Sequence, residues 1–154
     1  MKNTDVNKQI VRYRIIGEET NEQVFQVRDS TSAYEFIMKN VVDSSTLSVS
    51  EAFHAIYLDA KGHVKGFAKI SDGGINNATA DPRIIYYYAV TTLATAVILV
   101  HNHPSGDTQP SPDDRRLTKQ LIQAGKLLNV HVHDHLIITK DKYRSFRDWG
   151  DMND

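Results

Sequence analysis

The sequence predicts an α/β domain of the α+β type, in which helices flank a mixed β-sheet. Three observations lead to this class. Ala96–Val100 is the most apolar run of the chain and has the character of a buried strand. Apolar residues recur at i, i+4, i+7 and i+11 from Leu117 to Leu128, as in an amphipathic helix. Two β-rich segments, Ala52–Leu58 and His63–Ile70, are joined by a short turn and indicate a hairpin.

The first third of the chain predicts a hairpin followed by a short helix. Ile10–Ile16 and Val24–Val27 are β-rich and enclose a Gly-Glu-Glu turn. Asp29 begins an Asp-Ser-Thr-Ser turn and cap, which opens a helix predicted over Ala33–Val42. The segment carries no residues that suggest catalysis, so we interpret it as an element that covers or docks on the rest of the chain.

The later elements follow from the same patterns. Alternation along the second hairpin strand predicts one face toward a core, formed by Val64, Gly66, Ala68 and Ile70. Asp81-Pro82 caps a helix whose packed side is predicted to carry Ile85, Tyr88, Ala89, Thr92 and Leu93. Val130–Ile138 predicts a further strand, and Asp141–Phe146 predicts a short final helix or turn.

Length and composition limit the class of protein. With 154 residues and 40% apolar content, the chain can bury a substantial core. The polar connection Asp43–Ser50 divides it into an N-terminal extension, residues 1–45, and a main domain, residues 46–154. The N-terminus has no apolar leader and no run reaches the roughly eighteen residues of a membrane span, so we expect no membrane partner and a cytoplasmic location.

Charge and cysteine content exclude further classes. The chain has 18 basic and 19 acidic residues, a net charge of −1, which gives no electrostatic indication of nucleic-acid binding. It has no cysteine, which excludes disulfides, thiol catalysis and every metal site with cysteine ligands. A metal ion would therefore have to be held by histidine, aspartate or glutamate.

One stretch has the residue types and the spacing of a metal site. His101 and His103 end the buried strand, and alternate residues of a strand point to the same face. Asp114 lies eleven positions after His103, in the first turn of the predicted helix. Two imidazoles and a carboxylate, with a fourth position open to water, are the usual ligands of a catalytic zinc ion. We therefore predict one Zn²⁺ per chain, at a site whose donors also suit manganese or iron.

Two alternatives compete with this interpretation. Ser111-Pro-Asp-Asp114 is also a good helix start, with serine at the N-cap, proline at N1 and a carboxylate at N3. Capping and metal binding are compatible, because Asp114 can do both. A second cluster, His131, His133 and His135, would share one face of a regular strand and form a rival metal site. No carboxylate lies in phase with it, since Asp134 points the other way, so we favour the first site.

The complete string from His101 to Asp114, HNHPSGDTQPSPDD, resembles the signature of the JAMM/MPN metalloprotease superfamily and, within it, that of the RadC branch. The resemblance extends from about Glu51 to Gly150, roughly two thirds of the chain. It implies a curved mixed sheet between helices, with a layering similar to that of cytidine deaminases, and a RadC-like catalytic domain over residues 46–154.

The resemblance also implies roles for individual residues. Glu51 matches the glutamate that serves such enzymes as general base, and Ser111 matches the serine that stabilises the oxyanion. Zinc would be held by His101, His103 and Asp114, and the substrate would be a peptide or protein cleaved at a peptide or isopeptide bond. Residues of the same string that would orient the ligands are Asn102, Ser105 and Asp107.

Two other functions stay open at this stage. RadC-like proteins carry a link to DNA repair, so a non-hydrolytic binding or adaptor module that contacts DNA is an alternative. The balanced charge and the absence of a helix-hairpin-helix pattern in residues 10–42 argue against it. Metal-dependent hydrolysis of another amide or of a phosphoester is the third hypothesis, because the ligands do not select the substrate.

Overall fold

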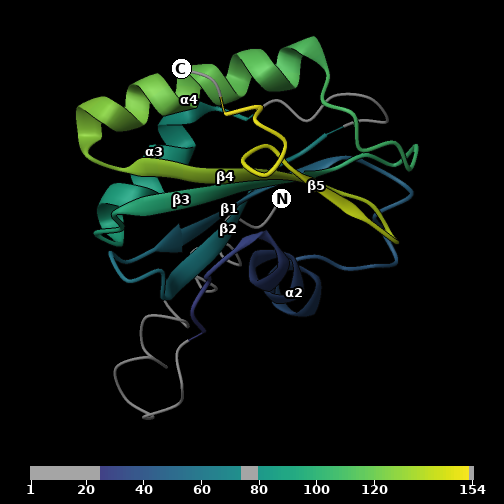
Figure 1. Cartoon of the computed structure of the whole chain (residues 1–154), viewed down its shortest axis with the longest axis horizontal. Helices are drawn as coiled ribbons and strands as arrows, with labels where there is room; N and C mark the ends of the chain where they lie inside the picture. Colours follow the sequence, from purple (N-terminus) through teal and green to yellow (C-terminus); the bar gives the residue numbers. More distant parts are fainter. Residues whose placement is uncertain (1–24, 74–79, 153–154) are drawn as a thin grey trace.

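A computed structural model describes residues 25–73 and 80–152 (Figure 1). The strands form one mixed five-stranded sheet in the order β2-β1-β3-β4-β5. In the described part of the chain the helices are α2 (Ser30–Asn40), α3 (Pro82–Thr91) and α4 (Pro112–Leu128), and the strands are β1 (Ala52–Leu58), β2 (Val64–Asp72), β3 (Ala96–Asn102), β4 (His131–Ile138) and β5 (Tyr143–Ser145). The predicted α+β class is confirmed.

The strand directions explain the arrangement of the helices. β1 pairs antiparallel with both β2 and β3, and β5 pairs antiparallel with β4. β3 and β4 are parallel, and α4 makes the crossover that a parallel pair requires. α3 and α4 lie on one face of the sheet and α2 lies on the other (Figure 1).

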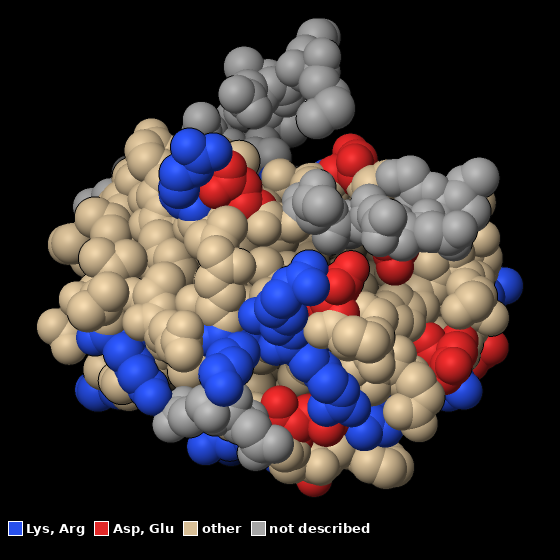
Figure 2. Space-filling model, turned by 90° about the horizontal axis from the view of Figure 1, so that it is seen from above, with Lys and Arg blue, Asp and Glu red and all other residues tan. Residues whose placement is uncertain are grey.

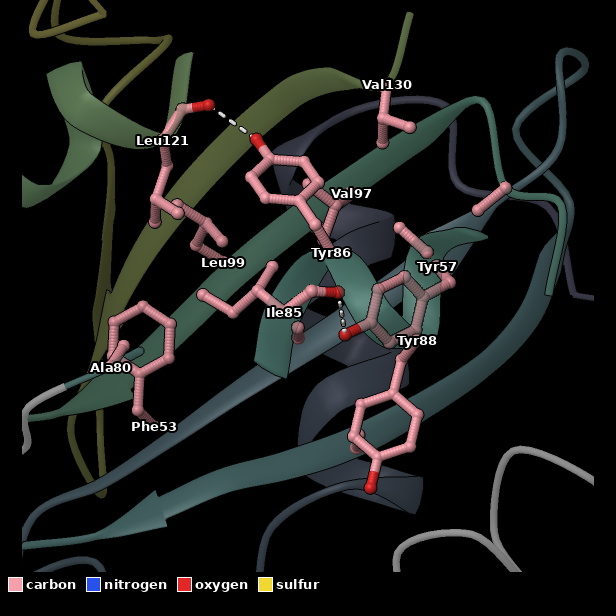
Figure 3. Packing of buried hydrophobic residues seen from close by; sticks show 14 residues of the cluster. Phe53, Tyr57, Ala80, Ile85, Tyr86, Tyr88, Val97, Leu99, Leu121 and Val130 are labelled. Carbon is pink, nitrogen blue, oxygen red and sulfur yellow. Dashed lines mark hydrogen bonds between the residues drawn. The ribbon is translucent and has the colours of Figure 1, made fainter. Parts of the chain in front are cut away.

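Because helices cover both faces, the central strands are buried on both sides. Every residue of β3 is buried, as its continuous apolar sequence predicts. The cluster on the α3 and α4 side includes Phe53, Ile85, Leu99 and Leu121 (Figure 3). The cluster on the α2 side includes Phe36, Ile37, Ile56, Ile98 and Leu136. α2 therefore packs on the same sheet, while the domain boundary near residue 45 stays a prediction.

Local sequence fixes the helix starts. Asp29 caps α2, where its side chain accepts a hydrogen bond from the Ser32 main chain at 2.8 Å. The helix begins at Ser30, slightly earlier than predicted. Asp81 caps α3 and Pro82 occupies its first turn, as the sequence indicates. Within the described residues, no helix combines the length and the apolar character needed to cross a membrane.

The predicted first hairpin is not tested, because Ile10–Ile16 lies outside the described residues. Its described part, Phe25–Val27, pairs with the turn at the start of β2. Other sequence expectations are wrong in detail. Asp141–Phe146 contains the edge strand β5 and no helix. Leu93 follows α3 with a φ of 52° and is 74% exposed, so it does not pack with that helix. Leu128 is also exposed, because α4 buries the face formed by Thr118, Leu121, Ile122 and Gly125.

Two β-bulges account for the errors in strand phase. In β2, Tyr57 pairs with Gly66 and Leu58 with Val64, which leaves an extra residue between the two pairs. Val64 therefore packs in the cluster on the α2 side, and not with Ala68 on the α3 side as alternation predicts. In β4 the extra residue is His133, because Val97 pairs with Val132 and Ile98 pairs with Asp134.

A close approach between elements on the α3 side occurs at Gly125. A Cβ atom at this position would lie 2.2 Å from the carbonyl oxygen of Val130 and 2.7 Å from the hydroxyl of Tyr86. The Tyr86 hydroxyl donates a hydrogen bond to the carbonyl of Leu121, and that of Tyr57 donates to Ile85 at 2.9 Å (Figure 3). Only glycine allows α4, α3 and the start of β4 to meet in this way.

Replacement of Gly125 by alanine should therefore destabilise the protein, although alanine favours a helix. We expect overpacking to lower the free energy of unfolding by about 1–3 kcal/mol, measured by urea denaturation. Gln123→Ala, an exposed position of the same helix, is the control and should leave stability nearly unchanged. Equal stability of the two variants would contradict the close packing described for Gly125.

Candidate metal centre

The predicted site residues come together at one end of the sheet. His101 and Asn102 end β3, and His103 follows directly. Since β1 runs antiparallel to β3, the start of β1 lies beside the end of β3, with Phe53 paired to His101. This places Glu51, the residue before β1, next to the histidines, and the first turn of α4 adds Asp114 from the other side.

The ligand atoms lie within a few ångströms of one another. Nε2 of His101 is 3.0 Å from Nε2 of His103 and 3.2 Å from Oδ1 of Asp114. Nε2 of His103 is 3.5 Å from Oδ2 of Asp114 and 3.9 Å from Oε1 of Glu51. The four side chains are mostly buried, with exposed fractions from 3% for His101 to 18% for Asp114. The cluster is thus enclosed but still reachable from solvent.

These distances suit a small divalent cation. In a tetrahedral zinc site with bonds of about 2.0–2.2 Å, neighbouring ligand atoms are about 3.3–3.6 Å apart. The two imidazoles and Asp114 are separated by 3.0–3.5 Å. Glu51 also belongs to the group of donors, within 4.8 Å of both histidines. Asp114 approaches both Nε2 atoms more closely than Glu51 approaches His103, as the predicted role of third ligand requires.

The charges of the cluster are strongly coupled. Burial raises the pKa of the Asp114 carboxyl, but the hydrogen bonds with His101 and His103, the charge of His101 and the main-chain N–H of Ser111 outweigh it and hold this pKa well below its usual range. Burial lowers the pKa of His103, while its bonds to Asp114 and to the Asp107 carbonyl, with the charges of Asp114 and Glu51, raise it overall. Asp114 is consequently ionised at neutral pH, which is the form that binds a metal.

The loop between His103 and α4 orients one of the histidines. Nδ1 of His103 donates a hydrogen bond to the main-chain carbonyl of Asp107 at 2.7 Å, which turns its Nε2 toward the site. The loop itself is held by Ser105, whose hydroxyl accepts from the Asp107 main chain at 3.3 Å. The Asp107 side chain accepts from the main chain of Gln109 at 3.0 Å. Ser105 and Asp107 therefore orient His103 through the backbone of the loop.

Ser111 and Asp114 form the capping box that the sequence predicts. The Ser111 hydroxyl accepts a hydrogen bond from the Asp114 main chain at 3.1 Å, and the Ser111 main chain donates to Oδ2 of Asp114 at 2.7 Å. Asp114 therefore caps α4 while Oδ1 faces His101. That Ser111 stabilises an oxyanion stays a prediction. In this role the Ser111 hydroxyl would donate its proton to the oxyanion, while its oxygen caps the helix.

Asn102 fixes the segment that carries Glu51. Its amide nitrogen donates to the carbonyls of Leu47 and Ser50, at 2.9 and 2.8 Å, and its amide oxygen accepts from the main chain of Ala52 at 2.8 Å. These bonds hold the chain on both sides of Glu51. Asn102 therefore positions Glu51, whereas the sequence predicts that it orients the metal ligands.

The second histidine cluster does not form a site of its own. The bulge at His133 breaks the strand phase, so the three histidines do not share a face. His133 receives a hydrogen bond from Arg147, and both His131 and His133 are exposed. His135 instead joins the main site, with Nε2 2.8 Å from Nδ1 of His101.

Sequence reasoning missed His135 and its neighbours as parts of this site. His135 contacts the hydroxyl of Thr118 through Nδ1, and burial, with the charge of His101, lowers its pKa well below the usual range. Phe53 stacks on His101 with an interplanar angle of 5°. The Asp-His-Leu run of β4 indicates a buried strand at this place. The sequence does not indicate the bulge that determines which way its side chains point.

The fold and this cluster define a mixed-sheet domain with a two-histidine, two-carboxylate site at the end of its central strand. Residues 27–151 match the family model of the RadC-like JAB domain, and the chain belongs to this family.

The chain is similar to several curated proteins that carry the name UPF0758. It is 39% identical over 119 residues to one from Symbiobacterium thermophilum, covering 77% of this chain and 49% of that protein. It is 36% identical over 132 residues to one from Protochlamydia amoebophila, covering 84% and 55%. A protein from Listeria welshimeri is 34% identical over 137 residues, covering 89% and 59%. The chain thus spans about half the length of these curated relatives.

The Asn102 bonds lead to a stability prediction. Asn102→Ala leaves two carbonyls and one N–H without their partner, and we expect it to lower the free energy of unfolding by about 2–3 kcal/mol. Urea denaturation measures the change. Ser105→Ala, which removes one exposed hydroxyl of the neighbouring loop, should cost less than about 1 kcal/mol. A loss for Asn102→Ala as small as that of Ser105→Ala would contradict the role of Asn102.

Proposed function

We propose that this protein is a zinc-dependent hydrolase that cleaves peptide or isopeptide bonds. The observation that carries the proposal is the convergence of His101, His103 and Asp114, with ligand atoms 3.0–3.5 Å apart and the carboxylate of Glu51 beside them. Membership of the RadC-like JAB domain family supports it. The substrate class, the metal and the activity of the longer relatives are part of the proposal.

A bound zinc ion would polarise the scissile carbonyl and lower the pKa of a water molecule. The protein's own residues supply the rest. His101 and His103 would hold the ion through Nε2, and ionised Asp114 would add a negative charge. Glu51 accepts a proton from the attacking water as the new C–O bond forms, and returns a proton to the leaving nitrogen as the C–N bond breaks.

The geometry suits Glu51 for proton transfer. Its Oε1 lies 3.9 Å from Nε2 of His103, close enough to contact a water molecule held between them. Its side chain is 12% exposed, which shields the proton from bulk solvent. The hydrogen bonds of Asn102 on both sides keep Glu51 at this position.

The surface charge does not favour the alternative of a DNA-binding module. Figure 2 looks down on the α4 side, where Lys and Arg side chains lie among Asp and Glu side chains. Several cations of the described residues are paired: Arg115 and Arg116 of α4 contact Asp151 and Asp113, and Arg144 of β5 also contacts Asp151. Paired charges attract a phosphate backbone less than a continuous basic stripe does.

The first prediction of the proposed function concerns the metal content of the protein. The purified protein supplied with zinc should bind about one ion per chain, because the site offers three ligands and an open position. His101→Ala and Asp114→Asn should each lose most of this zinc, measured by elemental analysis after dialysis. Gln123→Ala, an exposed position of α4, is the control and should retain it. If the unmodified protein binds no zinc, manganese or iron, the hydrolase proposal fails, and salt-dependent DNA binding then becomes the next experiment.

The second prediction separates chemistry from metal binding. Glu51→Gln should retain zinc, but its turnover of a peptide or isopeptide substrate should fall by about 10²–10⁴-fold, because an amide cannot accept the proton. Glu35→Gln, an exposed position of α2, is the matched control and should keep full activity. Full activity of Glu51→Gln would remove Glu51 as the base.

A further inference from the structure

A chain of three hydrogen bonds runs from His101 to the main chain of Asp114. Nδ1 of His101 lies 2.8 Å from Nε2 of His135. Nδ1 of His135 lies 2.7 Å from the hydroxyl of Thr118, which donates to the main-chain carbonyl of Asp114 at 2.7 Å. The chain thus begins and ends at two of the residues assigned as metal ligands.

The direction of every bond follows from counting protons. A carbonyl only accepts, so the single proton of the Thr118 hydroxyl points to Asp114, and its oxygen accepts from Nδ1 of His135. A neutral imidazole has one N–H, so Nε2 of His135 is an acceptor and Nδ1 of His101 must donate to it. In a neutral His101, Nε2 is then the nitrogen with the free lone pair, and it is the atom that faces His103 and Asp114.

We propose that His135 and Thr118 are positioning residues that keep the proton of His101 on Nδ1 and present its Nε2 to a metal ion. The proposal deepens the proposed function, because it rests on His101 as a ligand. If the Thr118 proton turned to His135 instead, every bond would reverse and Nε2 of His101 would carry the proton. In that state His101 could not bind a metal.

The surroundings protect the chain from competing water. Thr118 is 1% exposed, His135 is fully buried and His101 is 2% exposed. Phe146 stacks on His135 with ring centroids 4.5 Å apart, and Phe53 stacks on His101. The rings therefore cannot turn easily to exchange their donor and acceptor nitrogens.

The two histidines of the site are thus oriented in different ways. For His103 a single carbonyl of the loop, that of Asp107, takes the Nδ1 proton directly. For His101 the partner is the imidazole of His135, which can either donate or accept a hydrogen bond. A further residue must therefore determine which of the two His135 does. Thr118 does this from α4, one turn after Asp114, and so couples the helix start to the strand ligand.

Two matched pairs of variants test the proposal through zinc affinity, measured by competition with a chromophoric chelator. Thr118→Val keeps the shape but removes the hydroxyl, whereas Thr118→Ser keeps the hydroxyl. His135→Asn reaches only toward Thr118, whereas His135→Gln can still accept the His101 proton. We expect Thr118→Val and His135→Asn to weaken zinc binding about 10–100-fold, and Thr118→Ser and His135→Gln to stay within a few-fold of the unmodified protein.

A spectroscopic measurement tests the same chain without metal. The ¹⁵N chemical shifts of His101 in the metal-free protein should show Nδ1 protonated and Nε2 unprotonated in the unmodified protein and in Thr118→Ser. In Thr118→Val the two forms should mix. Urea denaturation of each variant identifies a general loss of folding, and the His135 pair gives an independent comparison if the valine variant is unstable.

The outcomes distinguish this inference from the proposed function. If the unmodified protein binds no metal, the hydrolase proposal fails, while the ¹⁵N shifts still test the hydrogen-bond chain. If the protein binds zinc and Thr118→Val and His135→Asn bind it equally tightly, the positioning role is overturned and the metal site stands. A proton on Nε2 in the neutral form of His101, in the unmodified, metal-free protein, would also overturn it.

Discussion

The antiparallel pairing of β1 with β3 is the constraint on which the site depends. It sets Phe53 opposite His101 and so brings the residue before β1, Glu51, to the end of the strand that carries the histidines. A shift of one residue in this register would turn the side chains of β1 to the opposite face of the sheet. Asn102 secures the same junction, because it ends β3 and holds the segment that leads into β1.

Asp114 joins the stability of α4 to the chemistry of the site. One carboxylate oxygen caps the helix through the main chain of Ser111, the other faces His101, and the main-chain carbonyl accepts from Thr118. The N-terminus of a helix stabilises a negative charge, so the fold itself favours an ionised carboxylate at this position. The capping geometry therefore leaves Asp114 able to take its proposed role as a metal ligand.

The sequence predicts those parts of the site that are local in the chain. His101, His103 and Asp114 follow from a strand, a loop and a helix start within fourteen residues, and the capping box follows from the same letters. Glu51 required the resemblance to a family, because it reaches the site only through pairing with a distant strand. The contacts of His135 and Asn102 could not be predicted, since they depend on a bulge in β4 and on the path of residues 47–52. Similarly, the edge strand β5 depends on pairing with β4 and has no strong pattern of its own.

The most direct test of the account is X-ray absorption spectroscopy at the zinc edge of the metal-loaded protein. We expect a first shell of four nitrogen or oxygen atoms at about 2.0–2.1 Å, with outer-shell scattering from two imidazoles. A first shell with three imidazoles would place His135 on the metal and contradict the role given to it. Six oxygen atoms without imidazole scattering would show that the cluster of Glu51, His101, His103 and Asp114 does not hold the ion.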